Sequence, residues 1–168
     1  MKRIGLLSDT HSYIDKPVLD FLSGMDEIWH AGDIGISDIV HSLQQICPVR
    51  AVAGNIDDNT LRALYKELMI FSCENLKVLL VHIGGFPGKY HPGIKQILLQ
   101  NEINLFISGH SHILKVMYDK ALGIMHLNPG AAGMSGFHTK RTALRFVVDN
   151  QDIKNLQILE IERNRVIA

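Results

Sequence analysis

The alternation of predicted strands with predicted helices constrains the fold of this chain more than any other feature of its sequence. Short runs at residues 4–7, 27–30 and 49–53 predict strands. The segments between them, residues 17–22 and 37–45, predict helices, the second because its apolar residues recur at spacings of three and four. Strands that alternate with helices at this pace indicate βαβ units and therefore a parallel sheet.

The pattern changes at Leu68, where paired strands replace the alternation. Three pairs of strand-like runs each flank a polar dipeptide (Glu74-Asn75, Asp119-Lys120 or Asp149-Asn150): 68–73 with 77–83, 113–118 with 124–127, and 141–148 with 153–161. A helix at 91–100 and a strand at 104–107 lie between the first two pairs. Hairpins beside a parallel part predict mixed sheets. No linker or low-complexity segment is visible, so we expect a single α/β domain spanning residues 1–168.

Acidic, amide and imidazole side chains follow five of the predicted strands, usually beside a glycine. In chain order they are Asp9 and His11, Asp33, Asn55 and Asp57, His82, and His110 with His112. In open α/β sheets, sites form in the loops at the carboxyl ends of the strands. Glycine lets the backbone turn sharply there and brings neighbouring side chains together. We therefore expect these residues to converge.

Oxygen and imidazole donors without a thiol suit Mn²⁺, Fe or Zn²⁺ rather than a structural zinc finger. Seven such donors, the set above without Asp57, exceed what one tetrahedral ion needs. They match two ions that share a bridging carboxylate, an arrangement used for in-line displacement at phosphorus. Taken singly, each motif has a plainer explanation: a helix cap, a turn at Gly32-Asp33 or Gly54-Asn55, or a core histidine at His82. Two imidazoles flanking Ser111 after a buried strand are the hardest to explain in that way.

The charge balance excludes several classes of partner. Seventeen basic and 17 acidic residues give a formal net charge of zero, so no global basic field gathers nucleic acid or an anionic membrane. We expect neither as a partner. Two cysteines, Cys47 and Cys73, are too few for a disulfide framework, which favours a reducing cytoplasm. No apolar run approaches the length of a membrane span.

The five motifs, in this order along the chain, resemble those of the calcineurin-like metallophosphoesterase superfamily: Asp9-x-His11, Gly32-Asp33, Gly54-Asn55-x-Asp57, His82 and Gly109-His110-x-His112. The small size looks like its compact bacterial and archaeal phosphodiesterase branch, and Asn128-Pro129-Gly130 matches a turn typical of that branch. The resemblance extends from residue 4 to about residue 130. It implies a four-layer α/β/β/α sandwich of two mixed sheets with helices outside.

The resemblance also implies a role for each side chain. Asp9, His11 and His112 would hold one metal ion, Asn55, His82 and His110 the other, and Asp33 would bridge them. Mn²⁺ is the first choice for both ions, with Fe, Ni or Zn as alternatives. A hydroxide between the ions would attack the phosphorus of a small phosphate ester in line. Asp33, Asn55 and His82 would carry catalysis, with Asp57 and His30 in support.

Two departures from the family's pattern concern the leaving group. Many relatives have histidine after Gly-Asn, where this chain has Ile56, and the compact branch often has Gly-His after the fourth-motif histidine, where this chain has Ile83-Gly84-Gly85. Both changes remove an imidazole that could protonate an alkoxide, a contribution of about 10²–10⁴-fold. We therefore expect diesters or activated esters to be preferred over simple alkyl monoesters.

Several alternatives stay open at this level. A non-catalytic scaffold that keeps the fold is the main rival, and a single-zinc hydrolase is a second. The loop at residues 84–93 is either a wall of the substrate pocket or a surface turn. His138, Lys140 and Arg141 either contact the substrate or form a solvated strand start. Homo-oligomers occur among relatives, but no residue decides the oligomeric state.

Overall fold

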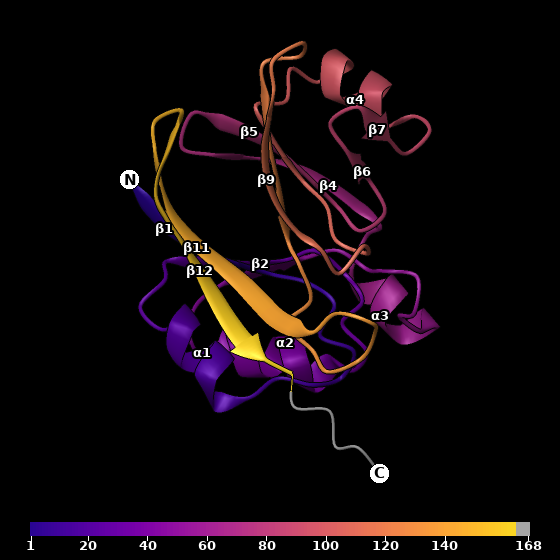
Figure 1. Ribbon diagram of the computed structural model, residues 1–168, viewed down its shortest axis with the longest axis vertical. Helices are drawn as coiled ribbons and strands as arrows, with labels where there is room; N and C mark the ends of the chain where they lie inside the picture. Colours follow the sequence, from indigo (N-terminus) through magenta and orange to yellow (C-terminus); the bar gives the residue numbers. More distant parts are fainter. Residues whose placement is uncertain (164–168) are drawn as a thin grey trace.

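The computed structural model describes residues 1–163 and contains two five-stranded sheets. The first sheet has the order β12-β11-β1-β2-β3. Its strands are β1 (Lys2–Leu7), β2 (Glu27–His30), β3 (Val49–Ala51), β11 (Lys140–Asp149) and β12 (Asp152–Glu162). β1, β2 and β3 run parallel, whereas β11 and β12 form an antiparallel hairpin against β1 (Figure 1).

The second sheet has the order β4-β5-β8-β10-β9. Its strands are β4 (Leu68–Cys73), β5 (Leu76–Val81), β8 (Leu105–Ile107), β9 (Leu114–Asp119) and β10 (Ile124–Pro129). β5, β8 and β10 are parallel, and the two edge strands are antiparallel to their neighbours. All three hairpins expected from the sequence are therefore confirmed, and both sheets are mixed.

Three apolar layers hold the fold together. Between the sheets, Trp29 and Phe146 of the first sheet pack in one cluster with Leu80 and Ile107 of the second. On the outer face of the first sheet lie α1 (Lys16–Leu22) and α2 (Ser37–Gln44), and on the outer face of the second lies α4 (Ile94–Gln100) (Figure 1). The order of layers is thus helix, sheet, sheet, helix, as expected. The short α3 (Asn59–Leu64) packs Leu61 into the cluster under α1 and α2.

The segment at residues 84–93 is more ordered than a surface turn. It contains a two-stranded hairpin of β6 (Gly85–Phe86) and β7 (Lys89–Tyr90), which lies beside α4 (Figure 1). The sequence did not indicate this hairpin because glycine and proline mask the strand pattern.

One expectation about a solvated strand start is wrong. Arg141 is buried, and its guanidinium donates two hydrogen bonds of 2.8 Å to the carboxylate of Asp15. Asp15 occupies the N-cap position of α1 but makes no capping bond through its side chain, because that side chain binds Arg141. Within residues 1–163, no helix combines the length and apolar character required to span a bilayer.

Candidate metal centre

The loops that follow β1, β2, β3, β5 and β8 come together because the strands end in register. Leu7 pairs with His30 across β1 and β2, and Leu80 pairs with Ile107 across β5 and β8. Each loop therefore begins at nearly the same level of its sheet. The backbone N–H of His110 donates to Asp9 Oδ2 at 3.1 Å, which joins the loops of the two sheets. The carboxyl ends of strands from both sheets thus form one site.

A first group of ligand-type atoms contains Asp9, His11 and His112, whose donor atoms all lie within 4.8 Å of one another. The Nε2 atoms of the two histidines are 3.3 Å apart. His112 Nε2 lies 3.1 Å from Asp9 Oδ1, and His11 Nε2 lies 3.9 Å from the same oxygen. Residues separated by 101 positions along the chain thus face one another.

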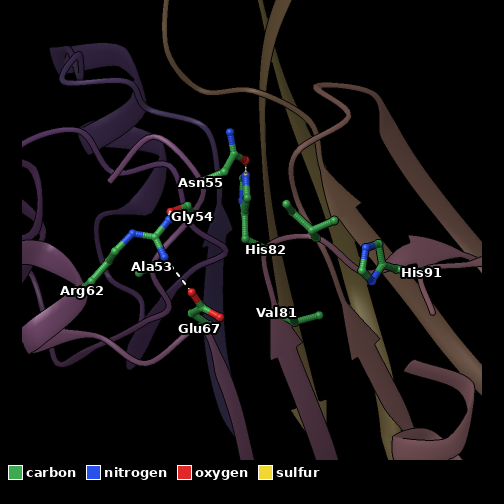
Figure 2. Close-up of a pocket in the computed structure, with 9 residues that line it drawn as sticks. Ala53, Gly54, Asn55, Arg62, Glu67, Val81, His82 and His91 are labelled. Carbon is green, nitrogen blue, oxygen red and sulfur yellow. Dashed lines mark hydrogen bonds and ion pairs between the residues drawn. The ribbon is translucent and has the colours of Figure 1, made fainter. Parts of the chain in front are cut away.

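A second group contains Asp33, His82 and His110 within the same 4.8 Å limit. His82 Nε2 lies 3.2 Å from Asp33 Oδ1 and 3.1 Å from Asn55 Oδ1. Figure 2 shows Asn55 directed at the imidazole of His82. The ring of His110 stands edge-on to that of His82, with centroids 5.2 Å apart.

Asp33 faces both groups. Its Oδ1 is directed at His82 of the second group, and its Oδ2 lies 3.6 Å from His11 Nε2 of the first. A carboxylate that presents one oxygen to each of two ligand groups has the geometry of a bridge between two cations. Seven of the eight side chains expected to converge are therefore brought together, with Asp33 at the centre.

The donor atoms fit a cation better than they fit one another. Asp9 Oδ1 is buried and has no hydrogen-bond partner, although His112 Nε2 is only 3.1 Å away. An unsatisfied buried carboxylate oxygen is costly unless a cation compensates it. Divalent metal ions can provide this compensation, because they bind nitrogen and oxygen lone pairs that face a shared space. The residues present thus fit two metal ions.

Hydrogen bonds on the far side of the rings leave Nε2 free to bind a metal in two of the histidines. His82 Nδ1 lies 2.7 Å from the carbonyl oxygen of Ala31, which can only accept, so Nδ1 carries the proton. His138 Nε2 donates to the carbonyl of Gly133, so in the neutral ring its Nδ1 is an acceptor. His112 Nδ1, 3.2 Å from that atom, is then the donor. The Nε2 lone pairs of His82 and His112 therefore point into the site.

The backbone is strained where the ligands lie. Five of the seven residues (Asp9, His11, Asp33, His110 and His112) have φ between 45° and 67°, a region that residues other than glycine seldom occupy. Such conformations cost about 1–3 kcal/mol each and cluster at functional sites. Gly54 is required for a related reason, because a Cβ there would overlap the backbone and carboxylate of Asp33.

The charges in the site favour a cation. Burial lowers the pKa of His82, but its hydrogen bond to Asp33 and the charges of Asp9 and Asp33 outweigh this effect, so the pKa is raised. Burial raises the pKa of Asp33, but the hydrogen bond with His82 outweighs it, and the pKa is lowered. Without metal, the carboxylates therefore stabilise a protonated His82, whose positive charge takes the place of the charge of a metal ion.

Asp57 and His30 lie outside both groups. The two carboxylate oxygens of Asp57 accept from the backbone N–H groups of Gly35 (2.8 Å) and Gly54 (2.7 Å), so this residue fixes the loop that carries Asn55. His30 accepts from the N–H of Gly32 through Nδ1, and its Nε2 lies 2.9 Å from Thr10 Oγ1. Burial lowers the pKa of His30 to about 4, consistent with a neutral ring. Both residues are buried, with an exposure of 0% for His30 and 4% for Asp57.

A cavity of about 230 Å³ adjoins the second group on the side of Asn55 and His82. Arg62 and Glu67 form an ion pair of 2.6 Å on one wall, and His91 lies on the other (Figure 2). Ile83 also lines it, and Ile56 is exposed beside Asn55. Ile56 and Gly84 therefore occupy the two positions where the family resemblance leads one to expect an additional imidazole, and Ile83 lies beside the second.

Comparison with known proteins assigns the family. A family model described as the calcineurin-like phosphoesterase superfamily domain matches residues 1–151. The chain belongs to the calcineurin-like phosphoesterase superfamily. A probable metallophosphoesterase of the archaeon Methanocaldococcus jannaschii is 32% identical over 164 residues, which cover 94% of this chain and 82% of the relative.

Solved structures with a similar fold support the architecture. A novel archaeal phosphodiesterase aligns with a TM-score of 0.76 at 15% identity, covering 95% of this chain and 99% of the other. Vps29 of Entamoeba histolytica, solved in complex with Zn²⁺, aligns with a TM-score of 0.75 at 17% identity, covering 96% and 99%. At these identities the likeness concerns the fold alone.

Sequence reasoning missed the contact of His138 with the site. This histidine was assigned either to substrate contact or to a solvated strand start, but its ring stands edge-on to that of His112, with centroids 5.1 Å apart. The only signal in the sequence is a histidine after the glycine-rich segment at residues 130–136, which indicates neither partner nor orientation.

Proposed function

We propose that this phosphoesterase is a phosphodiesterase that works with two divalent metal ions. Asp9, His11 and His112 hold one ion, Asn55, His82 and His110 hold the other, and Asp33 bridges them. The observation that carries the proposal is that the two oxygens of Asp33 face the two ligand groups separately. Mixed oxygen and imidazole donors favour Mn²⁺ as the first choice, with Fe, Ni or Zn as alternatives.

Two divalent ions, when bound, would make water acidic enough to supply the nucleophile at neutral pH and would offset charge on the phosphoryl oxygens. The chain contributes two formal negative charges to the ligand set, those of Asp9 and Asp33. Because Asn55 is a neutral ligand, the site keeps a positive excess that attracts a phosphate anion. Ala31 and His138, through their hydrogen bonds, hold the imidazoles of His82 and His112 with Nε2 inward.

The apolar rim supports diesters as substrates. Ile56 and Ile83 are 45% and 36% exposed, and neither can donate a proton to an alkoxide leaving group. A phosphodiester has two organic arms, which apolar surface accommodates better than it accommodates the dianion of a monoester. We expect an aryl phosphodiester to react at least about 10²-fold faster, in kcat/KM, than an alkyl monoester. Equal or faster turnover of a plain sugar monophosphate would contradict this preference.

The bridging role of Asp33 is tested by Asp33→Asn, which keeps the size of the side chain and removes its charge. The metal content of wild type and variant is measured after reconstitution with Mn²⁺, and hydrolysis of bis(p-nitrophenyl) phosphate is followed in the same samples. We expect the variant to hold fewer than two ions per chain and to lose at least about 10²-fold in kcat/KM. Asp38→Asn, on the exposed surface of α2, is the matched control and should behave as wild type. Full activity and two ions in Asp33→Asn would refute the proposal.

A scaffold role is the second candidate, because the Vps29 structures share the fold. A scaffold does not need a complete ligand set, whereas all seven positions here carry donor side chains. The two candidates separate when a panel of mono- and diesters is assayed with several divalent metals. A chain that binds two ions per molecule and yet hydrolyses none of the panel would favour the scaffold.

A further inference from the structure

A second cavity, of about 430 Å³, lies under the β6–β7 hairpin. The hairpin contributes Phe86, Lys89 and Tyr90 to its lining, and Lys115 of β9 and Asn128 of β10 also line it. The volume is within the range of small-molecule sites and is far larger than a phosphate group requires. The segment whose role the sequence left open is therefore the wall of a cavity.

The cavity is continuous with the metal centre through His110. This histidine contributes a donor atom to the group with Asp33 and His82, and it also lines the cavity together with Gly109. A phosphodiester with its phosphorus at the metal centre can therefore extend one arm past His110 towards the hairpin. The smaller cavity beside Asn55, which shares His91 and Ile83 with this one, leaves room for the other arm.

The cavity is electropositive. Lys89 and Lys115 line it, and within residues 1–163 neither lysine forms an ion pair with a carboxylate. No aspartate or glutamate lines the cavity in this part of the chain. Asp119 lies behind the wall, where its carboxylate accepts from the hydroxyl of Tyr90 and from the backbone N–H groups of Ala121 and Leu122. A ligand group placed here meets uncompensated positive charge.

The walls are also aromatic. The Nζ of Lys115 lies 4.4 Å from the centre of the Phe86 ring, which holds the ammonium group at the edge of the cavity. The ring of Tyr90 is fixed from outside, because its hydroxyl is bound to Asp119. Flat rings are the groups that aromatic walls bind best, and an anion is the group that two unpaired lysines bind best.

We propose that this cavity, defined here as the hairpin subsite, binds a substrate arm that carries a flat ring and a further anionic group. The inference rests on the proposed phosphodiesterase function and specifies its substrate class: small diesters whose arm is an aryl or nucleoside group with its own phosphate or carboxylate. Lys115 is the specificity-determining residue, because Phe86 and β9 fix its position, whereas Lys89 lies exposed at the tip of the hairpin.

The kinetic test uses three p-nitrophenyl phosphodiesters whose second arm is methyl, phenyl or 4-carboxyphenyl. They share one leaving group, so differences in kcat/KM report on the arm. Wild type should prefer the carboxyphenyl diester over the phenyl diester by about tenfold, mainly through KM. Lys115→Gln should abolish that preference, so that its kcat/KM for the carboxyphenyl diester falls to that for the phenyl diester. Lys120→Gln, on the turn between β9 and β10 outside the cavity, is the matched control.

A binding measurement separates failure of the subsite from failure of the phosphodiesterase function. Calorimetric titration of chelator-treated protein compares 4-carboxyphenyl phosphate with phenyl phosphate, and stronger binding of the carboxylated ring by wild type than by Lys115→Gln supports the subsite. If no diester reacts, the phosphodiesterase proposal fails, and this comparison alone decides on the subsite. Equal binding of both rings, or an equal loss for both in Lys115→Gln, overturns the subsite even if diesters are hydrolysed.

Discussion

His138 offers the most incisive test of how the metal centre is held together. It lies 26 residues beyond His112, which within residues 1–163 is the one member of the two ligand groups to which it is hydrogen-bonded. The carbonyl of Gly133 accepts a hydrogen bond from His138 Nε2, which leaves His138 Nδ1 as an acceptor. His138 Nδ1 then accepts from His112 Nδ1, so the tautomer of His112 is fixed as well. Burial lowers the pKa of His138, which keeps the ring neutral and able to accept.

His138→Leu removes the acceptor and keeps an apolar side chain of similar volume. Loss of a hydrogen bond that orients a ligating histidine typically costs 10–100-fold in metal affinity, or about 1.4–2.7 kcal/mol. His112 is one of three donors in its group, so we expect the Kd of one ion to rise by this factor while the second ion stays bound. His138→Gln restores an acceptor oxygen and should recover part of the affinity.

The assay is competition for Mn²⁺ or Zn²⁺ against a fluorescent chelator, which resolves the two ions by their affinities. His41→Leu, an exposed histidine of α2, is the control for removal of an imidazole. Thermal unfolding in the presence of chelator reports any purely structural effect. Unchanged metal affinity in His138→Leu would refute the tautomer argument. An equal loss in both His138 variants, accompanied by a lower midpoint in chelator, would reassign the residue to packing.

Three further predictions concern the fold around the site. Gly54→Ala forces a methyl group into Asp33, so we expect loss of metal binding and a destabilisation of about 1–3 kcal/mol in chemical denaturation; wild-type metal content would contradict this. Burial lowers the pKa of His126 to about 4, compared with about 6.5 in the unfolded chain. The neutral ring therefore stabilises the folded state fully above about pH 6.5, and this stabilisation is lost as the pH falls towards 4. In metal-free protein this pKa shift contributes about 3 kcal/mol to the free energy of unfolding. His126→Gln should reduce the slope of that free energy against pH by about 1.4 kcal/mol per pH unit near pH 5, and an unchanged slope would exclude His126 as the source of the pH dependence. Asp15→Ala leaves the buried Arg141 unpaired and should cost about 3 kcal/mol, of which the added change Arg141→Met should recover part; a neutral single variant would show that the pair is solvated.

The convergence of the seven donors could be expected from the sequence because it follows from local rules. Strand ends are marked by apolar runs that stop at a polar residue, and parallel strands place those ends at one edge. The glycines at positions 32, 54 and 109 mark the points where the backbone passes close to ligand side chains. Local pattern and global fold therefore agree at this site, and the order of the motifs was enough to indicate it.

The features that escaped prediction depend on the paths of loops between layers. Arg141 meets Asp15 across 126 residues, and His138 meets His112 from a glycine-rich segment without periodicity. No local spacing encodes either contact, since both depend on how the β10–β11 connection crosses the end of the first sheet. The left-handed backbone at five ligand positions was also not visible, because aspartate and histidine do not mark it as glycine does.

Neither sheet alone contains a complete set of donors for the site. Asp9, Asp33 and Asn55 follow strands of the first sheet, whereas His82 and His110 follow strands of the second. The relative position of the sheets is set by the apolar cluster between them, in which Trp29 is fully buried. A slip of about 1 Å along that contact would separate the two half-sites by enough to cost about 10²-fold in rate. Substitutions in the apolar cluster between the sheets, although they contact neither metal nor ester, are therefore expected to lower the rate by displacing one half-site from the other.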